Sequence, residues 1–410
     1  MTYNYAQLSN GIRVIHRETS GNVAHCGVVI DAGSRDELPE ENGIAHFIEH
    51  IIFKGTKNRK AFHILSRLEN VGGDLNAYTA KEETFIYASF LKDYYERSLE
   101  LFADILFNST FPEKEIQKEK DVVLDEINSY KDSPSELIFD EFEELLFKGH
   151  PIGGSILGSP ETVKSFRRDD IIRFMLRNYL TSRMVISSVG NIRMDKLVML
   201  AEQFFGWVPV TNAEVKREMF EKYTPESKTE PKSNFQVHCV LGNLAYSLKN
   251  EKRTALALLN NILGGPGMNT RLNLNIRERY GYCYNIESHY QPFSDTGYFN
   301  IYIGTDNGYL DKSIQLIFKE LKALKERALG TLQLHRAKQQ IIGQLAISLE
   351  SGVGEMISIG KSHLFFDKVD TFEKIQQKIN LLTAKDLQDV ANEIFIQDKF
   401  STLTYLPKQP

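Results

Sequence analysis

The segment from Gly43 to Gly55 carries two histidines and a glutamate in the order H-x-x-E-H, and this order restricts the possible folds more than any other feature of the chain. At about 100° per residue, His46 and His50 lie one turn apart on the same face of a helix, with Glu49 beside them. The isoleucines lie on another face, where they can pack against a core: Ile44, Ile48 and Ile51. The fold must therefore bury one side of this helix and open the other to a cleft.

Two imidazoles one helical turn apart, with a carboxylate next to them, are typical of a catalytic zinc site. A chain with 10 histidines can also place two of them four residues apart by chance. A catalytic zinc ion takes three protein ligands and leaves a fourth position for water. The zinc interpretation therefore requires one more ligand elsewhere in the chain.

Candidates for that ligand lie on a second predicted helix, within residues 112–130. Apolar residues recur along it with the helical period: Ile116, Val123 and Ile127. Glu119 and Glu126 are nearly two turns apart on one face, so one can reach a metal while the other supports it. Glutamates on helix surfaces are commonly solvated charges, so these two residues alone leave the choice open.

With these residues the sequence resembles the inverted-motif zinc peptidases, the family of pitrilysin, insulysin and the mitochondrial processing peptidase. In that family a glutamate ligand follows the motif about three quarters of a hundred residues later, with a second glutamate upstream of it. Here Glu126 lies 76 residues after His50 (126 − 50), and Glu119 is at the upstream position. The resemblance implies one zinc ion per chain, held by three ligands: His46, His50 and Glu126. It also implies that Glu49 is the general base and that Glu119 supports the ligands.

The activity that the resemblance implies is peptide bond hydrolysis by a zinc metalloendopeptidase. Zinc lowers the pKa of bound water from about 15.7 to roughly 7, and Glu49 can take the proton and pass it to the leaving amine. The alternative is a catalytically idle relative that acts as a structural or regulatory subunit of a complex, as some family members do. The complete ligand set favours the enzyme.

The chain is predicted to form two halves of class α+β. Its 410 residues exceed what one core usually supports, and 42% of them are hydrophobic. Because residues 208–234 are rich in proline, lysine and glutamate, we expect a zinc-bearing domain over 1–210, a linker over 211–232 and a homologous domain without metal over 233–410. Each half is expected to be a mostly antiparallel sheet covered by helices on one face, and the resemblance implies that the homologous halves form a clam-shell assembly. The acidic stretch 139–146 is expected to be a solvated helix face.

Arg277 and Tyr284, in the second half, match the family pattern in which such a pair reaches toward the zinc. By resemblance they orient the substrate carbonyl and stabilise its oxyanion, since a cation and a phenol are donors suited to developing negative charge. Arg279, Tyr280 and Tyr282 are nearby competitors, and a tyrosine-rich strand is more often packing than catalysis.

Asn76, Ala77 and Tyr78 are candidate substrate-binding residues. They precede residues 84–90, which alternate as a strand does. The resemblance implies an exposed sheet edge here, to which an extended peptide adds as an extra strand while Tyr78 lines a side-chain pocket. The alternative is an interior strand preceded by a glycine turn.

The expected partners are a peptide substrate and a second copy of the chain. Family members with four such domains enclose a chamber, so a two-domain chain resembles half of one. A homodimer would complete the chamber, with each zinc site facing Arg277 and Tyr284 of its own chain or of its partner. Such a chamber would restrict substrates to short or unfolded peptides.

Other features exclude some classes of function. No run approaches the eighteen or so apolar residues of a membrane span, and the net charge of −5 disfavours nucleic acid as a ligand. The start of the sequence lacks a basic n-region and an apolar h-region, so we expect a cytoplasmic location, or a periplasmic or organellar one if a targeting segment has been removed. The three scattered cysteines, Cys26, Cys239 and Cys283, argue against a disulfide framework, and the apolar strand-like runs around Cys26 and Cys239 predict that these two thiols are buried.

Overall fold

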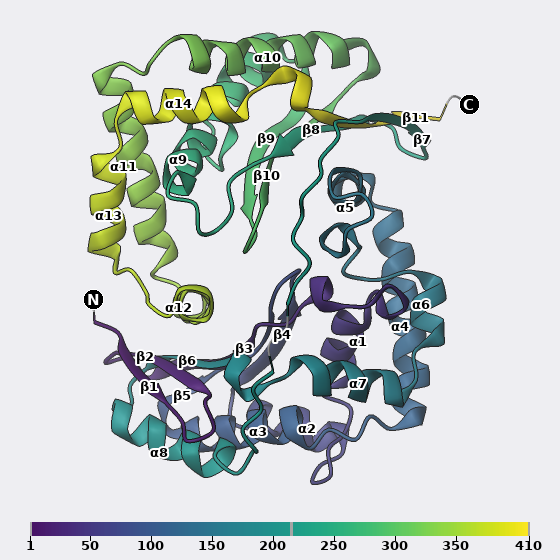
Figure 1. Cartoon of the computed structure of the whole chain (residues 1–410), viewed down its shortest axis with the longest axis vertical. Coiled ribbons are helices and arrows are strands. Elements are labelled where there is room, and N and C mark those ends of the chain that lie inside the picture. The colour runs from purple at the N-terminus through teal and green to yellow at the C-terminus, as the bar shows by residue number, and fades with distance from the viewer. Residues whose placement is uncertain (1, 214–215, 409–410) are drawn as a thin grey trace. The chain divides into compact units, whose positions relative to one another are not determined.

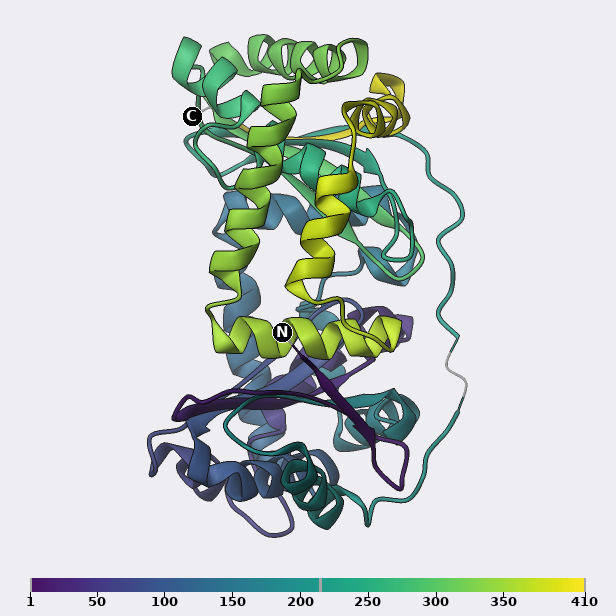
Figure 2. The same ribbon diagram turned by 90° about the vertical axis from the view of Figure 1, so that its left-hand side faces the viewer.

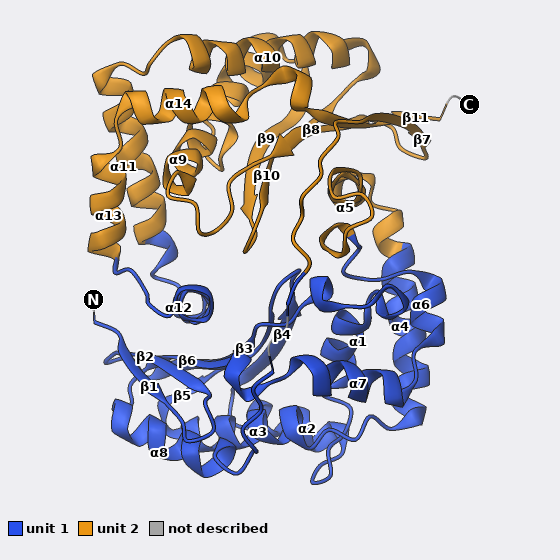
Figure 3. Ribbon diagram, viewed as in Figure 1, with its two compact units in different colours: residues 1–128, 154–217, 347–371 blue, residues 129–153, 218–346, 372–410 orange. Residues whose placement is uncertain are grey.

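The computed structural model describes residues 2–213 and 216–408; residues 1, 214, 215, 409 and 410, two of them in the expected linker, lie outside the described part (Figure 1). The chain forms two compact units, each built from one sheet and its helices (Figure 3). The first unit contains Met1–Asn128, Gly154–Arg217 and Ile347–Thr371. The second contains Ser129–Gly153, Glu218–Ala346 and Phe372–Pro410.

The sheet of the first unit has six strands in the order β1-β2-β6-β3-β5-β4. Their bounds are β1 Asn4–Gln7, β2 Arg13–Glu18, β3 Val23–Ile30, β4 Asp74–Thr79, β5 Thr84–Leu91 and β6 Met184–Gly190. Only β2 and β6 are parallel, and every other neighbouring pair is antiparallel. The sheet is therefore mostly antiparallel, as expected.

One face of this sheet packs on the main core of the first unit. Alternate residues of the central strands point to this face, among them Val14, Val28 and Ile86. The helices of the unit on this side and around the sheet are α1 Ile44–Ile51, α2 Ala61–Glu69, α3 Tyr95–Phe107, α4 Glu113–Lys131, α6 Pro160–Ser165, α7 Arg168–Asn178 and α8 Met194–Phe205. Their apolar faces supply most of the remaining core, which includes Phe47 and Phe102.

The opposite face is covered by α12, Gly352–Phe366, which comes from the second half of the sequence. Met356 and Ile359 pack against Val29 and Phe85, the residues that alternate away from the main core. Figure 2 shows this yellow-green helix running along one face of the strands, with the teal helix α8 beyond the other face. The structure thus adds a helix on the second face, where we expected helices on one face only.

The sheet of the second unit has five strands in the order β7-β11-β8-β10-β9. Their bounds are β7 Ser227–Lys232, β8 Val237–Leu244, β9 Cys283–Pro292, β10 Gly297–Thr305 and β11 Ser401–Pro407. Only β7 and β11 are parallel. Replacing β2 to β6 by β7 to β11 reproduces the strand order of the first sheet and the place of its parallel pair. The two halves therefore share one topology.

The second sheet is also covered on both faces. One face packs against α9 Arg253–Gly264, α10 Leu310–Glu326 and α14 Ala384–Ile394. The other face packs against α5, Pro134–Leu146, through Ile138 and Phe142. The remaining helices of this half are α11 Thr331–Ser348 and α13 Phe372–Leu381.

These helices correct the domain boundaries that composition predicted. α5 lies in the expected first domain but packs on the second sheet, and α12 does the reverse. The helical period shows that one face of α5 is buried but does not identify the sheet that buries it. The prediction that residues 139–146 form a solvated helix face is also wrong in part. Phe142 and Leu146, which belong to this stretch, are buried.

The expected linker over 211–232 is wrong at its end. Ser227–Lys232 form β7, which pairs with β11 over its whole length. Lysines and a proline at the edge of a sheet discourage pairing with other chains, so a polar composition here is compatible with an edge strand. Among the described residues, no helix is long and apolar enough to cross a membrane. The three cysteines are buried free thiols, as predicted for Cys26 and Cys239.

Candidate metal centre

The short helix α1 carries the H-x-x-E-H sequence and is buried on the side that the isoleucine spacing predicts. Ile44, Ile48 and Ile51 all lie in the main core of the first unit. His50 and Glu49 remain partly accessible, and His46 lies beside them with 7% of its surface exposed. The helix therefore presents its polar face away from the core.

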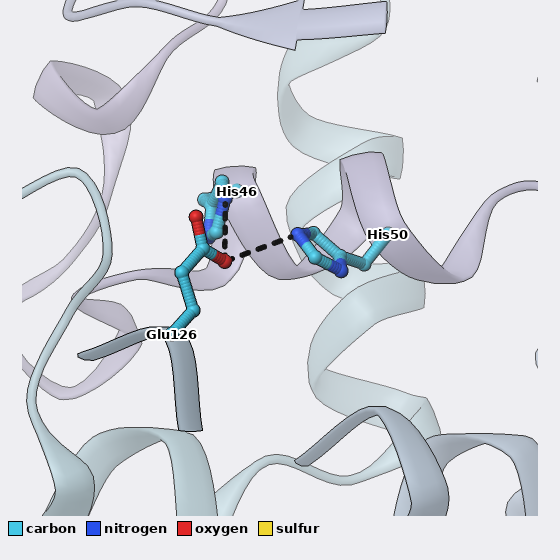
Figure 4. Close-up of side chains that lie close together, drawn as sticks. All are labelled: His46, His50 and Glu126. Atoms are coloured by element: carbon cyan, nitrogen blue, oxygen red, sulfur yellow. Dashed lines mark ion pairs between the residues drawn. The ribbon is translucent and has the colours of Figure 1, made fainter. Parts of the chain in front are cut away.

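The helix α4 brings a carboxylate between the two histidines. Oε2 of Glu126 lies 3.6 Å from Nε2 of His46 and 3.4 Å from Nε2 of His50, as the dashed lines in Figure 4 mark. One ligand atom from each residue can be chosen so that all three lie within 4.8 Å of one another. No other group of three potential metal ligands occurs in the part of the chain that the structure describes.

The distances in this group fit a shared zinc ion better than direct hydrogen bonds. Hydrogen bonds from nitrogen to oxygen are usually about 2.7–3.2 Å long. The distances from Oε2 of Glu126 to the two histidine nitrogens, 3.4 and 3.6 Å, are longer than this range. Two ligands at about 2.0 Å from one tetrahedral zinc ion lie roughly 3.3 Å apart. Two imidazoles and a carboxylate are also a ligand set typical of catalytic zinc.

Glu119, nearly two turns before Glu126 on α4, contacts His50. Its Oε2 lies 3.3 Å from Nδ1 of His50, and its Oε1 lies 2.6 Å from Nζ of Lys54. A proton on Nδ1 in this contact leaves the lone pair of Nε2 free for a ligand. Burial tends to raise the pKa of Glu119, but hydrogen bonds from His50 and Lys54 outweigh it and the pKa is lowered.

His46 is held differently. Burial lowers its pKa to about 4, helped by the neighbouring charge of His50, so His46 is neutral near pH 7 and able to bind a metal. Its Nδ1 is buried and has no hydrogen-bond partner among the described residues. The two rings meet edge to face, with centroids 4.7 Å apart.

Glu49 lies on α1 next to His50. Burial raises its pKa, and hydrogen bonds with Thr79 of β4 act in the opposite direction. β4 is the last strand of the first sheet and, within the described residues, pairs only with β5. The edge strand expected at Asn76 and Ala77 is therefore present, next to the helix that carries Glu49.

Tyr78 does not stand alone at this edge. Its ring stacks on Phe85 at 5.9 Å and meets Tyr87 edge to face at 6.4 Å. The side chain of Asn76 donates a hydrogen bond to Asp74. Tyr78 is therefore part of an aromatic cluster, while Asp74 and Asn76 are the exposed residues of β4.

Arg277 and Tyr284 both lie in the second unit. Arg277 is part of a π-helix, Asn273–Glu278, and its Nη1 donates to Oδ1 of Asn273 at 3.3 Å. Tyr284 is near the start of β9, with 56% of its surface exposed, and its hydroxyl donates to Asp306 at 3.1 Å. The nearby rings of Tyr280 and Tyr282 stack on each other at 5.2 Å, which is a packing arrangement.

Sequence reasoning missed two residues that hold this site. Lys54 lies three residues after Ile51, the last residue of α1 (54 − 51), and its contact with Glu119 depends on a second helix. Glu37 lies upstream of the motif, and its carboxyl oxygens accept hydrogen bonds from the backbone N–H groups of Gly43 and Ala45, each at 2.9 Å. A glutamate six residues before the glycine that precedes the helix was the available signal.

Comparisons with known proteins give related results for the two halves. The family description "Insulinase (Peptidase family M16)" matches residues 13–160, and "Peptidase M16 inactive domain" matches residues 165–341. An uncharacterized zinc protease of Bacillus subtilis (strain 168) is 36% identical over 95% of this chain and 95% of its own length. A probable mitochondrial-processing peptidase subunit beta of Schizosaccharomyces pombe is 30% identical over 96% of this chain and 88% of its own length.

A solved structure with the same fold is the crystal structure of a protease from Helicobacter pylori. It aligns with a TM-score of 0.92 and 23% identity, covering 99% of this chain and 100% of the other. At this identity the likeness concerns the fold alone. His46, Glu49, His50 and Glu126 all lie within the residues that match the insulinase description.

Proposed function

The chain belongs to the insulinase family of peptidases, family M16, and on this basis we propose that it is a zinc-dependent endopeptidase that cleaves short or unfolded peptides. The observation that carries the proposal is the convergence of Nε2 of His46 and Nε2 of His50 on one carboxylate oxygen of Glu126. Relatives of similar length are named zinc proteases, which supports zinc as the metal.

In this proposal, His46, His50 and Glu126 hold one zinc ion per chain. Neutral imidazoles leave the ion its positive charge, and the carboxylate completes a three-ligand set with a position left for water. When bound, zinc acts as a Lewis acid on the scissile carbonyl and makes water a better nucleophile at neutral pH. Glu119 and Lys54 keep the ring of His50 oriented.

Glu49 acts as the general base. Its carboxylate is held near His50 and Thr79, and burial raises its pKa towards the range useful for proton transfer near neutral pH. It accepts a proton from the attacking water and delivers a proton to the leaving amine. A carboxamide at this position can do neither.

The substrate is held in an extended conformation along β4. Backbone groups of Asn76 and Ala77 offer main-chain hydrogen bonds at an edge strand, which bind a peptide with little demand on its sequence. Tyr78 contributes an aromatic wall. Arg277 and Tyr284, from this chain or a partner chain, orient the carbonyl and stabilise its oxyanion, because both side chains are hydrogen-bond donors.

We further propose that two copies of the chain form a homodimer that encloses the peptide. The likeness to a mitochondrial-processing peptidase subunit makes a complex with a different chain the competing arrangement. A catalytically idle subunit is the alternative function, and the inactive-domain description supports it for residues 165–341 only. The three proposed ligands and the proposed base lie outside residues 165–341, which favours the enzyme: His46, His50, Glu126 and Glu49.

The experiment that tests the function is the Glu49→Gln substitution. We expect the variant to keep its zinc, because none of the proposed ligands changes, and to lose cleavage of a fluorogenic unfolded peptide by 100-fold or more. Metal content and turnover are measured on the same preparation. Cleavage near the parent rate would reject Glu49 as the base, and a parent chain that binds zinc but cleaves no unfolded peptide would support the idle subunit.

A further inference from the structure

The N-cap residue of helix α1 has no side chain that could cap the helix. This residue is Gly43, whose φ of +92° is a left-handed conformation that favours glycine. A β-carbon at this position would lie 2.6 Å from Gly158 and 2.7 Å from the carbonyl oxygen of Leu157. The close approach of the 157–158 loop excludes a serine, threonine or aspartate, the usual capping residues. The first N–H groups of this buried helix therefore need an acceptor from elsewhere.

Glu37 supplies that acceptor from outside the helix. Its Oε2 accepts the N–H of Gly43 and its Oε1 accepts the N–H of Ala45, both at 2.9 Å. Nδ2 of Asn42 also donates to Oε2, at 3.4 Å. Only 7% of Glu37 is exposed, so no water can easily replace these bonds if they are lost.

The segment that carries Glu37 is itself firmly anchored. The backbone N–H of Arg35 donates to the carbonyl of Lys81, and the guanidinium of Arg35 pairs with Glu82 at 2.7 Å. Next along the chain, Asp36 accepts two hydrogen bonds from Arg217, at 3.0 and 2.8 Å. The segment therefore holds Glu37 in place, so that Glu37 can fix the position of the first turn of α1.

The positions of the His46 and His50 rings depend on Glu37 to different degrees. His50 lies in the last turn of α1, and Glu119 holds its ring from α4. His46 lies in the first turn, directly after Ala45, and its Nδ1 has no hydrogen-bond partner in the described part of the chain. The position of the His46 ring is thus set by the backbone of the first turn, which Glu37 holds.

We propose that Glu37 is a positioning residue of the metal centre, which fixes the first turn of α1 so that His46 presents Nε2 to the metal. This inference rests on the proposed zinc site. Removing support of this kind from a ligand typically costs 10- to 100-fold in metal affinity. Glu37→Gln tests it, because the new amide points an N–H at a backbone N–H while the size of the side chain is preserved.

The matched control is Glu202→Gln. Glu202 also uses both carboxylate oxygens, to accept the N–H and the hydroxyl of Ser9, but it lies on α8 and its hydrogen bonds go to the segment before β2. Zinc affinity of the full chain is measured by competition with a chromophoric chelator. We expect Glu37→Gln to bind zinc at least 10-fold more weakly, Glu202→Gln to stay within twofold of the parent, and excess zinc to restore kcat of the Glu37 variant.

Amide hydrogen exchange of the zinc-free protein separates this inference from the proposed function. Faster exchange at residues 43–47 in Glu37→Gln supports the capping role, and unchanged exchange there, or zinc affinity within twofold of the parent, overturns the inference. A parent chain that binds no zinc rejects the proposed function, while the exchange result still decides the capping role. If Glu37→Gln does not fold, Glu37→Asp, which is too short to hold both N–H groups, is measured in the same way.

Discussion

At the scale of single residues, the two proposed histidine ligands differ in how their rings are held. Their spacing on one helix follows from the sequence, and the structure brings Glu126 to both of them. Glu119 was also predicted from the sequence, but two other supporting residues were not. Lys54 and Glu37 contact groups that lie in other segments of the chain, and no periodicity in the sequence indicates such contacts.

Lys54 offers a test of the support behind His50. Lys54→Met removes the cation that contacts Glu119 at 2.6 Å but preserves most of the length of the side chain. Because Glu119 then loses its charged partner and orients His50 less firmly, we expect zinc affinity to fall about 10-fold. Competition titration measures the change.

The control for this variant is Lys118→Met, one residue before Glu119. Lys118 has an exposed side chain that pairs with Glu115 within α4, a contact that contributes little to stability. Zinc affinity equal to the parent value is expected for it. An equal loss in both variants would mean that general charge, and not the contact with Glu119, determines the affinity.

At the scale of helices and strands, local pattern predicted several elements, but neither the helix α12 nor the sheet on which α5 packs. The isoleucine spacing predicted the buried side of α1, and alternation predicted the strand over 84–90, which is part of β5. α5 and α12 were not placed, because an amphipathic period reveals that a helix has a buried face without naming the surface opposite it. Their positions depend on contacts between residues far apart in the chain.

The packing of α12 on the first sheet can be tested through one glycine. A β-carbon at Gly360 would lie 2.9 Å from Cβ of Ser187 and 3.2 Å from Phe85, so Gly360→Ala forces the helix away from the sheet. We expect a net loss of about 1 kcal/mol in the free energy of unfolding, because overpacking outweighs the better helix propensity of alanine. Urea denaturation measures it.

Gly343, within α11, is the matched control. A β-carbon there meets no atom within 4 Å, so Gly343→Ala gains helix propensity without a clash. We expect this variant to be more stable by about 0.5–1 kcal/mol. If both glycine variants stabilise the protein, the close contact between α12 and the sheet is not present in solution.

At the scale of the whole molecule, the two units repeat one topology, and each has one sheet face covered by a helix from the other half of the sequence. The repeat agrees with the prediction of two homologous halves. The predicted boundaries at residues 210 and 233 assign every helix to the half of the sequence in which it lies, so they misplace α5 and α12. Composition identifies polar segments, but it does not identify the sheet on which the buried face of a helix packs. Arg277 and Tyr284 belong to the second unit, so their proposed action on the metal centre remains a prediction about the assembled protein.

We propose that His46, His50 and Glu126 hold a zinc ion that the chain needs for peptide hydrolysis. The most direct measurement is elemental analysis of the purified full chain, combined with cleavage of a fluorogenic unfolded peptide before and after chelation. We expect one zinc ion per chain, loss of cleavage when zinc is removed, and recovery when zinc is returned. A chain that contains no zinc when zinc is supplied, or cleavage that is indifferent to chelation, would contradict it.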